Sequence, residues 1–154
     1  MLAVPDFEEL LKLLNKHKVK YCIVGAYATA FYSKPRYTKD LDILVEPTQK
    51  NGQRIIQALG DFGFASLKLS EKDFCLEKQI IQLGYEPIRI DLLTSIEGCS
   101  FKEVWKNKKR GAYGKQKVYF IGINELIKNK GKSGRTQDLA DLETIKKVKR
   151  KKST

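Results

Sequence analysis

Asp40 and Asp42 are the residues whose types and spacing point most directly to chemistry, because these two carboxylates flank one apolar residue. The run continues as Ile43-Leu44-Val45, which is typical of a β-strand. Side chains in a strand alternate between its two faces, so both carboxylates point the same way. Such a pair can hold a hard cation such as Mg²⁺. The bland alternative is a turn residue followed by an exposed strand position, because a motif this short also arises by chance.

Two further features add to this pair. Asp91 is the single acid of a second apolar run, Ile88–Leu93, and the small residues Gly25 and Ala26 directly follow the apolar residues 21–24. A turn of small residues can present backbone amides to a phosphate. Together the three carboxylates and the turn predict metal-assisted phosphoryl chemistry. For Asp91, the alternative is an ion pair with Arg89.

A sheet is needed to bring these residues together. Hydrophobic periodicity, caps and breakers predict an α+β fold, with a mixed β-sheet and helices packed on it. Asp6 is expected to cap the first helix and Thr48 a later one. The region 64–82 is ambiguous: it could hold two short strands, 65–69 and 74–76, and the second could continue to Leu83. The remaining expected strands are 21–24, 40–46, 88–93 and 117–121, and the remaining helices are 26–32, 101–105, 124–130 and 136–148.

Composition limits the classes of function. With 154 residues, the chain suits one domain, expected over 1–145, followed by a basic tail, 146–154, that frays. No apolar run approaches the roughly 20 residues that span a bilayer, and no secretory leader is recognisable. Three dispersed cysteines and one histidine argue against structural zinc and for the cytoplasm. The net charge of +12 favours a polyanionic partner such as RNA, although solvated surface lysine explains it equally well.

At this point the motifs resemble a known family. Gly25-Ala26, then Arg36-x-Thr38-x-Asp40-Leu-Asp42, then Asp91, then Lys130 with Gly134-Arg135 and the Asp138-Leu-Ala-Asp141-Leu stretch are similar to the polymerase-beta-type nucleotidyltransferase superfamily. The nearest likeness is to its small prokaryotic branch, which includes AbiEii-type toxins. One position departs from the pattern, because the family usually has Gly-Gly or Gly-Ser where this chain has Gly25-Ala26.

The resemblance implies a polymerase-beta-like fold and a transferase. That enzyme would move a nucleoside monophosphate from an NTP such as ATP to a hydroxyl group and release pyrophosphate. RNA, such as a tRNA end, is the favoured acceptor, and a protein or a small molecule is the other choice. Two Mg²⁺ ions, replaceable by Mn²⁺, would be held by Asp40, Asp42 and Asp91. Nucleotide contacts would come from Gly25, Ala26, Arg36, Thr38, Lys130 and Arg135, with Asp138 and Asp141 supporting Lys130 or Arg135.

Two alternatives come from another class of protein. One is a catalytically silent member of the fold that binds RNA, and the other is a toxin–antitoxin component that acts through a protein partner. Trp105 and Tyr113 flank the basic run Lys106–Arg110, a pattern that can stack and clamp single-stranded nucleic acid. A core tryptophan beside a solvated loop is the simpler interpretation of that pattern.

Overall fold

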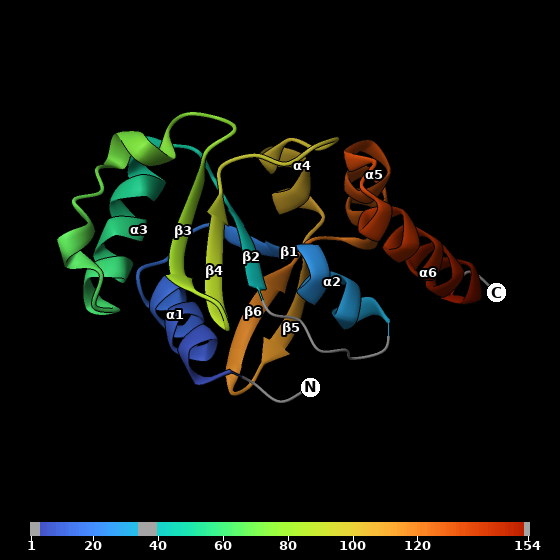
Figure 1. The fold of residues 1–154 in the computed structure, drawn as a ribbon, viewed down its shortest axis with the longest axis horizontal. Helices are drawn as coiled ribbons and strands as arrows, with labels where there is room; N and C mark the ends of the chain where they lie inside the picture. The colour runs from blue at the N-terminus through green and yellow to red at the C-terminus, as the bar shows by residue number, and fades with distance from the viewer. Residues whose placement is uncertain (1–3, 34–39, 153–154) are drawn as a thin grey trace.

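The computed structural model of the protein describes residues 4–33 and 40–152. Its centre is one six-stranded mixed sheet with the strand order β3-β4-β2-β1-β6-β5 (Figure 1). The strands are β1 (Tyr21–Val24), β2 (Asp40–Val45), β3 (Ile80–Tyr85), β4 (Ile88–Leu93), β5 (Lys109–Tyr113) and β6 (Gln116–Phe120). β2 runs parallel to β4, and β1 runs parallel to β6, while the other neighbours are antiparallel. The α+β prediction with a mixed sheet is therefore confirmed.

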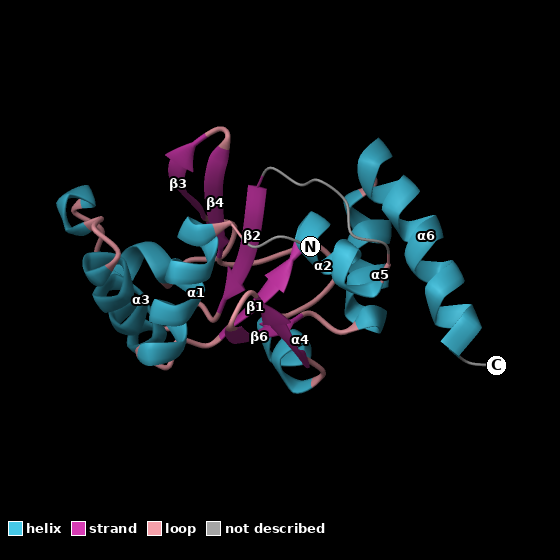
Figure 2. Ribbon diagram, turned by 90° about the horizontal axis from the view of Figure 1, so that it is seen from below, coloured by secondary structure: helices cyan, strands magenta, loops and turns pink. Residues whose placement is uncertain are grey.

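Helices cover both sides of this sheet. They are α1 (Pro5–Lys16), α2 (Gly25–Tyr32), α3 (Gln49–Asp61), α4 (Phe101–Lys106), α5 (Ile123–Ser133) and α6 (Thr136–Lys152), with single 3₁₀ turns η1 (Ala65–Leu67) and η2 (Glu71–Phe74). Figures 1 and 2 place α1 and α3 on one side, and α2, α5 and α6 on the other. Among the described residues, no helix is long and apolar enough to cross a membrane.

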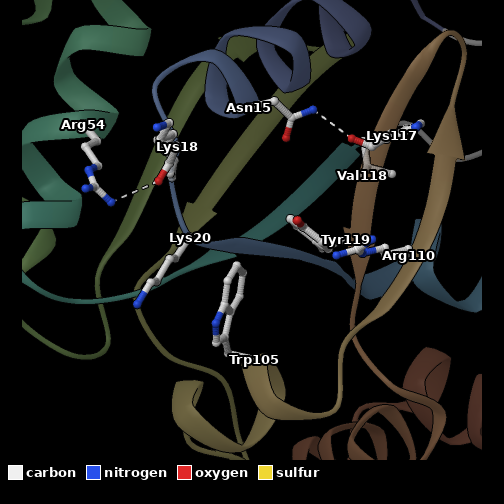
Figure 3. Close-up of a pocket in the computed structure, with 10 residues that line it drawn as sticks. Asn15, Lys18, Lys20, Arg54, Trp105, Arg110, Lys117, Val118 and Tyr119 are labelled. Atoms are coloured by element: carbon white, nitrogen blue, oxygen red, sulfur yellow. Dashed lines mark hydrogen bonds between the residues drawn. The ribbon is translucent and has the colours of Figure 1, made fainter.

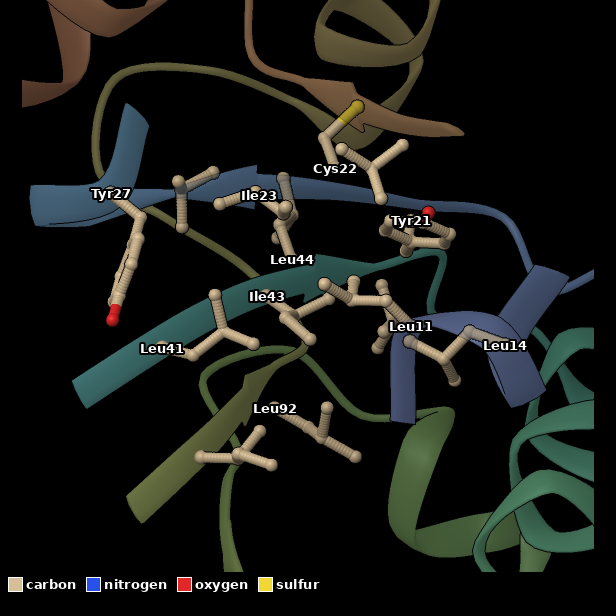
Figure 4. Packing of buried hydrophobic residues seen from close by; sticks show 14 of the residues in the cluster. Leu11, Leu14, Tyr21, Cys22, Ile23, Tyr27, Leu41, Ile43, Leu44 and Leu92 are labelled. Atoms are coloured by element: carbon tan, nitrogen blue, oxygen red, sulfur yellow. The ribbon is translucent and has the colours of Figure 1, made fainter. Parts of the chain in front are cut away.

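The core forms between α1 and the central strands. Leu11 and Leu14 lie on the apolar stripe of α1 and pack against β1 and β2, where Ile23 and Ile43 are fully buried (Figure 4). Cys22 points to the opposite face of the sheet, so β1 is buried on both faces and reads as a continuous apolar run. Each fully buried leucine contributes about 1.5–3 kcal/mol through its removal from water. This rigid centre holds the strand ends that carry the acids.

Helix boundaries follow local chemistry, with one correction at the first helix. Thr48 caps α3 as expected, because its Oγ1 accepts a hydrogen bond from the backbone N–H of Asn51. Asp6 does not cap α1. Pro5 already occupies the first turn, since its fixed φ suits that position, and Asp6 lies inside the helix beside the N-terminal dipole.

Several segments differ from what the sequence predicts. Residues 65–69 and 74–76 are not strands. Instead η1 and η2 pack as single turns against α3, and the Asp73 carboxylate accepts a hydrogen bond from the N–H of Ser70. The basic run that begins at Lys106 continues into β5, an edge strand that pairs with β6. Residues 146–152 of the tail that is expected to fray lie in α6, which continues to Lys152.

Candidate active site

The acids predicted from the sequence meet where β2 and β4 lie side by side. The parallel register sets Asp42 opposite Asp91 and Asp40 opposite Arg89. Residues two apart in a strand share a face, so all four side chains project from the same face of the sheet. Asp91 is almost fully buried, whereas Asp40 and Asp42 are half-buried. Two carboxylates from one strand and one from its neighbour thus form a compact acidic group.

Arg89 is the counter-ion of this group. Its Nε and Nη2 atoms donate hydrogen bonds to the two carboxylate oxygens of Asp91 at 3.2 and 2.9 Å. Nη2 also lies 3.4 Å from Oδ2 of Asp40. The ion pair of Asp91 with Arg89, which the sequence left as an alternative, is therefore present. Arg89 lies two residues before Asp91, so the strand period alone could have placed it in the site.

One carboxylate oxygen of this acidic group lacks a hydrogen-bond partner. Oδ1 of Asp40 is buried and finds no hydrogen-bond partner among the described residues. A buried oxygen of this kind can accept from a bound ion or an ordered water. Within the part of the chain that the structure describes, no three acidic, histidine or cysteine side chains are grouped closely enough to hold a metal as they stand. The oxygen donors suit a hard cation, provided that Arg89 moves aside.

Asp42 shows the electrostatic cost of this arrangement. Burial, and then the neighbouring charges of Asp91 and Asp40, raise the pKa of Asp42 to about 6. Lys130 and Arg89 oppose the shift but do not cancel it. A cation bound between the carboxylates would stabilise their charged forms, so the raised pKa is a property of the metal-free site.

We expect a distinctive pH dependence of stability from Asp42. Its pKa lies near 3.8 when unperturbed and about 6 in the fold, so the folded state holds the proton more tightly. Stability contributed by the protonated form is therefore present below pH 3.8 and is lost as pH rises to about 6. In metal-free buffer, Asp42→Asn should exceed the wild type in unfolding free energy by about 1–3 kcal/mol at pH 7. Urea denaturation across pH measures this.

The two unfolding curves should converge as pH falls towards the ordinary pKa of an aspartate, because the wild-type carboxyl is then neutral as well. A wild type that is equally or more stable than Asp42→Asn at pH 7 without metal would contradict the electrostatic interpretation. The Asp40→Asn variant serves as a comparison in which the same charge is removed at a position where Arg89 provides a partner.

The turn after β1 abuts the acids. Gly25 has φ +68°, a conformation that favours glycine, and a Cβ built on it would clash with Oδ2 of Asp42. The same residue begins α2, where no side chain caps the helix, so its first backbone N–H groups are open to an anion. Ala26 follows in the first turn of the helix and is half-buried. The geometry needs glycine only at position 25.

Lys130 lies in a buried ionic cluster with Asp138 and Asp141. Its Nζ donates to Asp138 at 2.9 Å and to Asp141 at 3.2 Å, and all three side chains are almost fully buried. Ser133 and Arg135 also donate to Asp138. Lys130 is therefore a buried, paired cation rather than a solvated one at a helix boundary.

The cluster has its own pH signature. Burial alone would raise the pKa of Asp138, but the hydrogen bonds from Ser133, Lys130 and Arg135 prevail and lower it to about 2. The stability that Asp138 contributes is therefore present above pH 3.8 and is lost as pH falls towards 2. The cluster ties α5 to α6, and α5 in turn approaches the acids, since the charge of Lys130 acts on Asp42.

The predicted nucleotide contacts are only partly brought together. Gly25, Ala26 and Lys130 lie around the acids, and the Arg135 side chain is 79% exposed at the start of α6. Arg36 and Thr38 lie outside the described residues. Tyr113 is buried, and its hydroxyl accepts a hydrogen bond from the N–H of Val4, so it is a core residue rather than a stacking platform.

Comparisons with known proteins bear on the fold. No protein-family model and no curated protein matches the sequence. Three solved structures are similar: an antigenic nucleotidyltransferase-like protein from Paracoccidioides brasiliensis (TM-score 0.56, 12% identity, 94% of this chain and 77% of that chain), the lincosamide antibiotic adenylyltransferase LnuA bound to lincomycin (0.57, 17%, 96% and 98%), and a candidate nucleotidyltransferase from Thermotoga maritima (0.60, 13%, 93% and 93%). The chain therefore has the nucleotidyltransferase fold that the sequence predicts.

Proposed function

We propose that this protein transfers a nucleoside monophosphate from an NTP such as ATP to a hydroxyl acceptor and releases pyrophosphate. The observation that carries the proposal is the register of β2 and β4, which sets Asp42 against Asp91 beside the glycine turn at Gly25. The fold shared with nucleotidyltransferase structures supports it. The likeness to AbiEii-type toxins is the finer part of the same proposal.

Asp40, Asp42 and Asp91 would hold Mg²⁺, with Mn²⁺ as a substitute. The buried unpaired oxygen of Asp40 and the raised pKa of Asp42 are the features that a cation would relieve. Two such ions stabilise charge on the attacking and leaving oxygens when bound. To admit them, Arg89 must release Asp91, and its exposed end can then turn towards the β- or γ-phosphate of the nucleotide.

The residues then have distinct roles in one displacement. The acceptor oxygen forms a bond to the α-phosphorus, and the bond from that phosphorus to the bridging oxygen of pyrophosphate breaks. Asp91 would take the proton of the acceptor hydroxyl. It lies on β4, beside Asp40 and Asp42 on β2.

The nucleotide side of the site would use backbone as well as cations. The open N–H groups at the start of α2 can donate to the phosphates, and the helix dipole favours anions there. Arg36 and Thr38 stay proposed contacts. Arg135 reaches outward from the ionic cluster and is the more accessible cation, whereas Lys130 acts from its buried position.

RNA, such as a tRNA end, is the acceptor that we propose first. The net charge of +12 attracts polyanions at long range and is not needed for a neutral small molecule. The likeness to LnuA, which was solved with lincomycin, keeps a small hydroxyl compound as the second choice. A protein acceptor or a toxin–antitoxin partner would be a further variant of the same chemistry. We propose that the protein acts in the cytoplasm.

A catalytically silent role is the competing proposal, and one observation favours it. Arg89 already neutralises Asp91 and lies beside Asp40, so the acids are partly satisfied without metal. In that case the fold would bind RNA through its basic surface and transfer nothing. The two proposals differ in whether Mg²⁺ and an NTP bind at all.

One experiment separates them. The protein is incubated with each α-³²P-labelled NTP, Mg²⁺ and either total RNA, cell protein or a small hydroxyl compound, and the labelled product is identified. We expect label in RNA with one preferred NTP, and none with Asp40→Asn/Asp42→Asn. A wild type that labels none of the three acceptors, and whose melting temperature is not raised by Mg²⁺ relative to that variant, would favour the silent role.

A further inference from the structure

A pocket on this molecule lies away from the acids, at the opposite end of the central strands. Its volume is about 610 Å³, within the range of roughly 300–1,000 Å³ that holds small ligands. It begins at Lys20, just before β1, whereas the acids lie beside Val24 at the far end of that strand. Four residues of strand, at about 3.3 Å each, put about 13 Å between these two ends. The pocket is therefore separate from the proposed active site.

The lining combines cations with aromatic rings. Five of its ten residues are lysine or arginine and none is acidic; these cations are Lys18, Lys20, Arg54, Arg110 and Lys117. Figure 3 shows Trp105 rising from α4 into this space, with Lys20 on one side and Tyr119 and Arg110 on the other. The cations come from α3, β5, β6 and the loop before β1, so the fold gathers them from distant parts of the chain.

The tryptophan ring is half-buried and already attracts cations. The Nζ atom of Lys108 lies 3.8 Å from the ring centre of Trp105 and 5.3 Å from that of Tyr119. The Nζ atom of Lys20 lies farther from the Trp105 ring, at 5.9 Å, and its partner Glu46 is 3.6 Å away. Lys20 is thus loosely held on the ring and can yield its place to a base. The ring is held by packing against Phe101 and Tyr119.

Several of the cations have no acidic partner. Among the described residues, Lys18, Arg110 and Lys117 make no ion pair, and Arg54 donates to the backbone oxygen of Lys18. Lys117 and Arg110 are exposed on the β5–β6 hairpin, where they line the pocket. Unpaired cations along a rim favour an extended polyanion rather than a single compact anion.

We propose that this pocket binds single-stranded nucleic acid. One base stacks on Trp105 on the side of Lys20, and the phosphates of the strand run over Arg110 and Lys117. Stacking needs an unpaired base, which excludes a duplex, and every base offers a π-face, so sequence preference is weak. The proposal stands apart from nucleotide transfer, because it requires neither NTP nor metal.

Trp105 is the only tryptophan in the chain, so its fluorescence reports directly on the pocket. The intact protein without metal or NTP is titrated with oligouridylate or oligothymidylate of about ten nucleotides, a length in the range of known single-strand sites. We expect quenching of the Trp105 emission by one or both oligonucleotides, and weaker quenching by the matching duplex. Tighter binding of oligouridylate than of oligothymidylate would assign the site to RNA. Equal binding of the two would assign it to single strands in general.

Variants separate the pocket from the general charge of the protein. Arg110→Ala/Lys117→Ala should weaken binding about tenfold at low salt and reduce the slope of log K against log salt by about 1–2. Lys72→Ala/Lys132→Ala removes the same charge from residues that do not line the pocket and should leave binding nearly unchanged. Trp105→Phe, followed by filter binding, should lower affinity less than the loss of both cations.

Three results would overturn the proposal. They are absence of quenching by either single strand, equal weakening by the two double variants, and equally tight binding of a mononucleotide, which would mark a small-ligand site instead. If the protein binds the single-stranded oligonucleotides but labels no acceptor in the transfer experiment, only the proposed nucleotide transfer is contradicted.

Discussion

Replacing Asp91 with alanine is expected to reduce nucleotide transfer about 10²–10⁴-fold, the range for loss of a positioned acid–base group. The loss should fall on kcat, because Asp91 acts on the acceptor proton and the NTP is bound mainly by the Gly25 turn and by cations. The KM for the NTP should stay within about threefold. Steady-state kinetics with the preferred NTP measure both constants.

The matched control is Glu103→Ala. Glu103 is also an acid in an ion pair, with Lys128 at 2.9 Å, but it lies on α4 rather than beside the acids. Its activity should equal that of the wild type. Asp91→Asn keeps the shape of the side chain and should be as inactive as the alanine variant. If Asp91→Ala retains wild-type kcat, Asp91 has no part in proton transfer.

Lys130→Met is expected to destabilise the fold by about 3–5 kcal/mol, the typical cost of leaving buried charges unpaired. The methionine fills much of the same volume, but Asp138 and Asp141 lose the ammonium that both accept from. For a chain of this size, such a loss lowers the melting temperature on the order of 10 °C. Urea denaturation gives the free energy directly.

Arg135→Met provides the control within the same cluster. Arg135 also donates to Asp138, at 2.8 Å, but its side chain is largely exposed, so its removal should cost about 1 kcal/mol or less. Adding Asp138→Asn and Asp141→Asn to Lys130→Met should recover part of the stability, because the uncompensated charges are then gone. Equal effects of Lys130→Met and Arg135→Met would show that burial does not govern this cluster.

The parts of the site that depend on the pattern within a single strand could be predicted from the sequence. The period of two in β2 places Asp40 and Asp42 on one face, and β4 has the predicted bounds, Ile88–Leu93. The register of Asp42 to Asp91 could not be derived, since parallel pairing depends on the path of the chain between the strands. The strand period places Arg89 on the same face as Asp91, but its contact with Asp40 depends on the same register.

Elsewhere the sequence misled for physical reasons. Apolar residues around Phe74 suggested strands, but a hydrogen bond between Ser70 and Asp73 closes a 3₁₀ turn there, a signal present in the Ser-x-x-Asp spacing. The charged start of β5 resembled a loop because edge strands carry lysine and arginine, which hinder pairing with other chains. The contribution of Tyr119 to the basic pocket depends on tertiary packing and has no local signal.

The ionic cluster of α5 and α6 also affects the order in which this protein matures. Every strand precedes α5 in the chain, so during synthesis the sheet and its acids can form before α6 has emerged from the ribosome. Until then Lys130 lacks Asp138 and Asp141, and its charge acts on Asp42 without those two carboxylates beside it. Docking of α6 supplies two carboxylates to that cation, so this helix influences the electrostatic state of an acid site to which it contributes no predicted metal ligand.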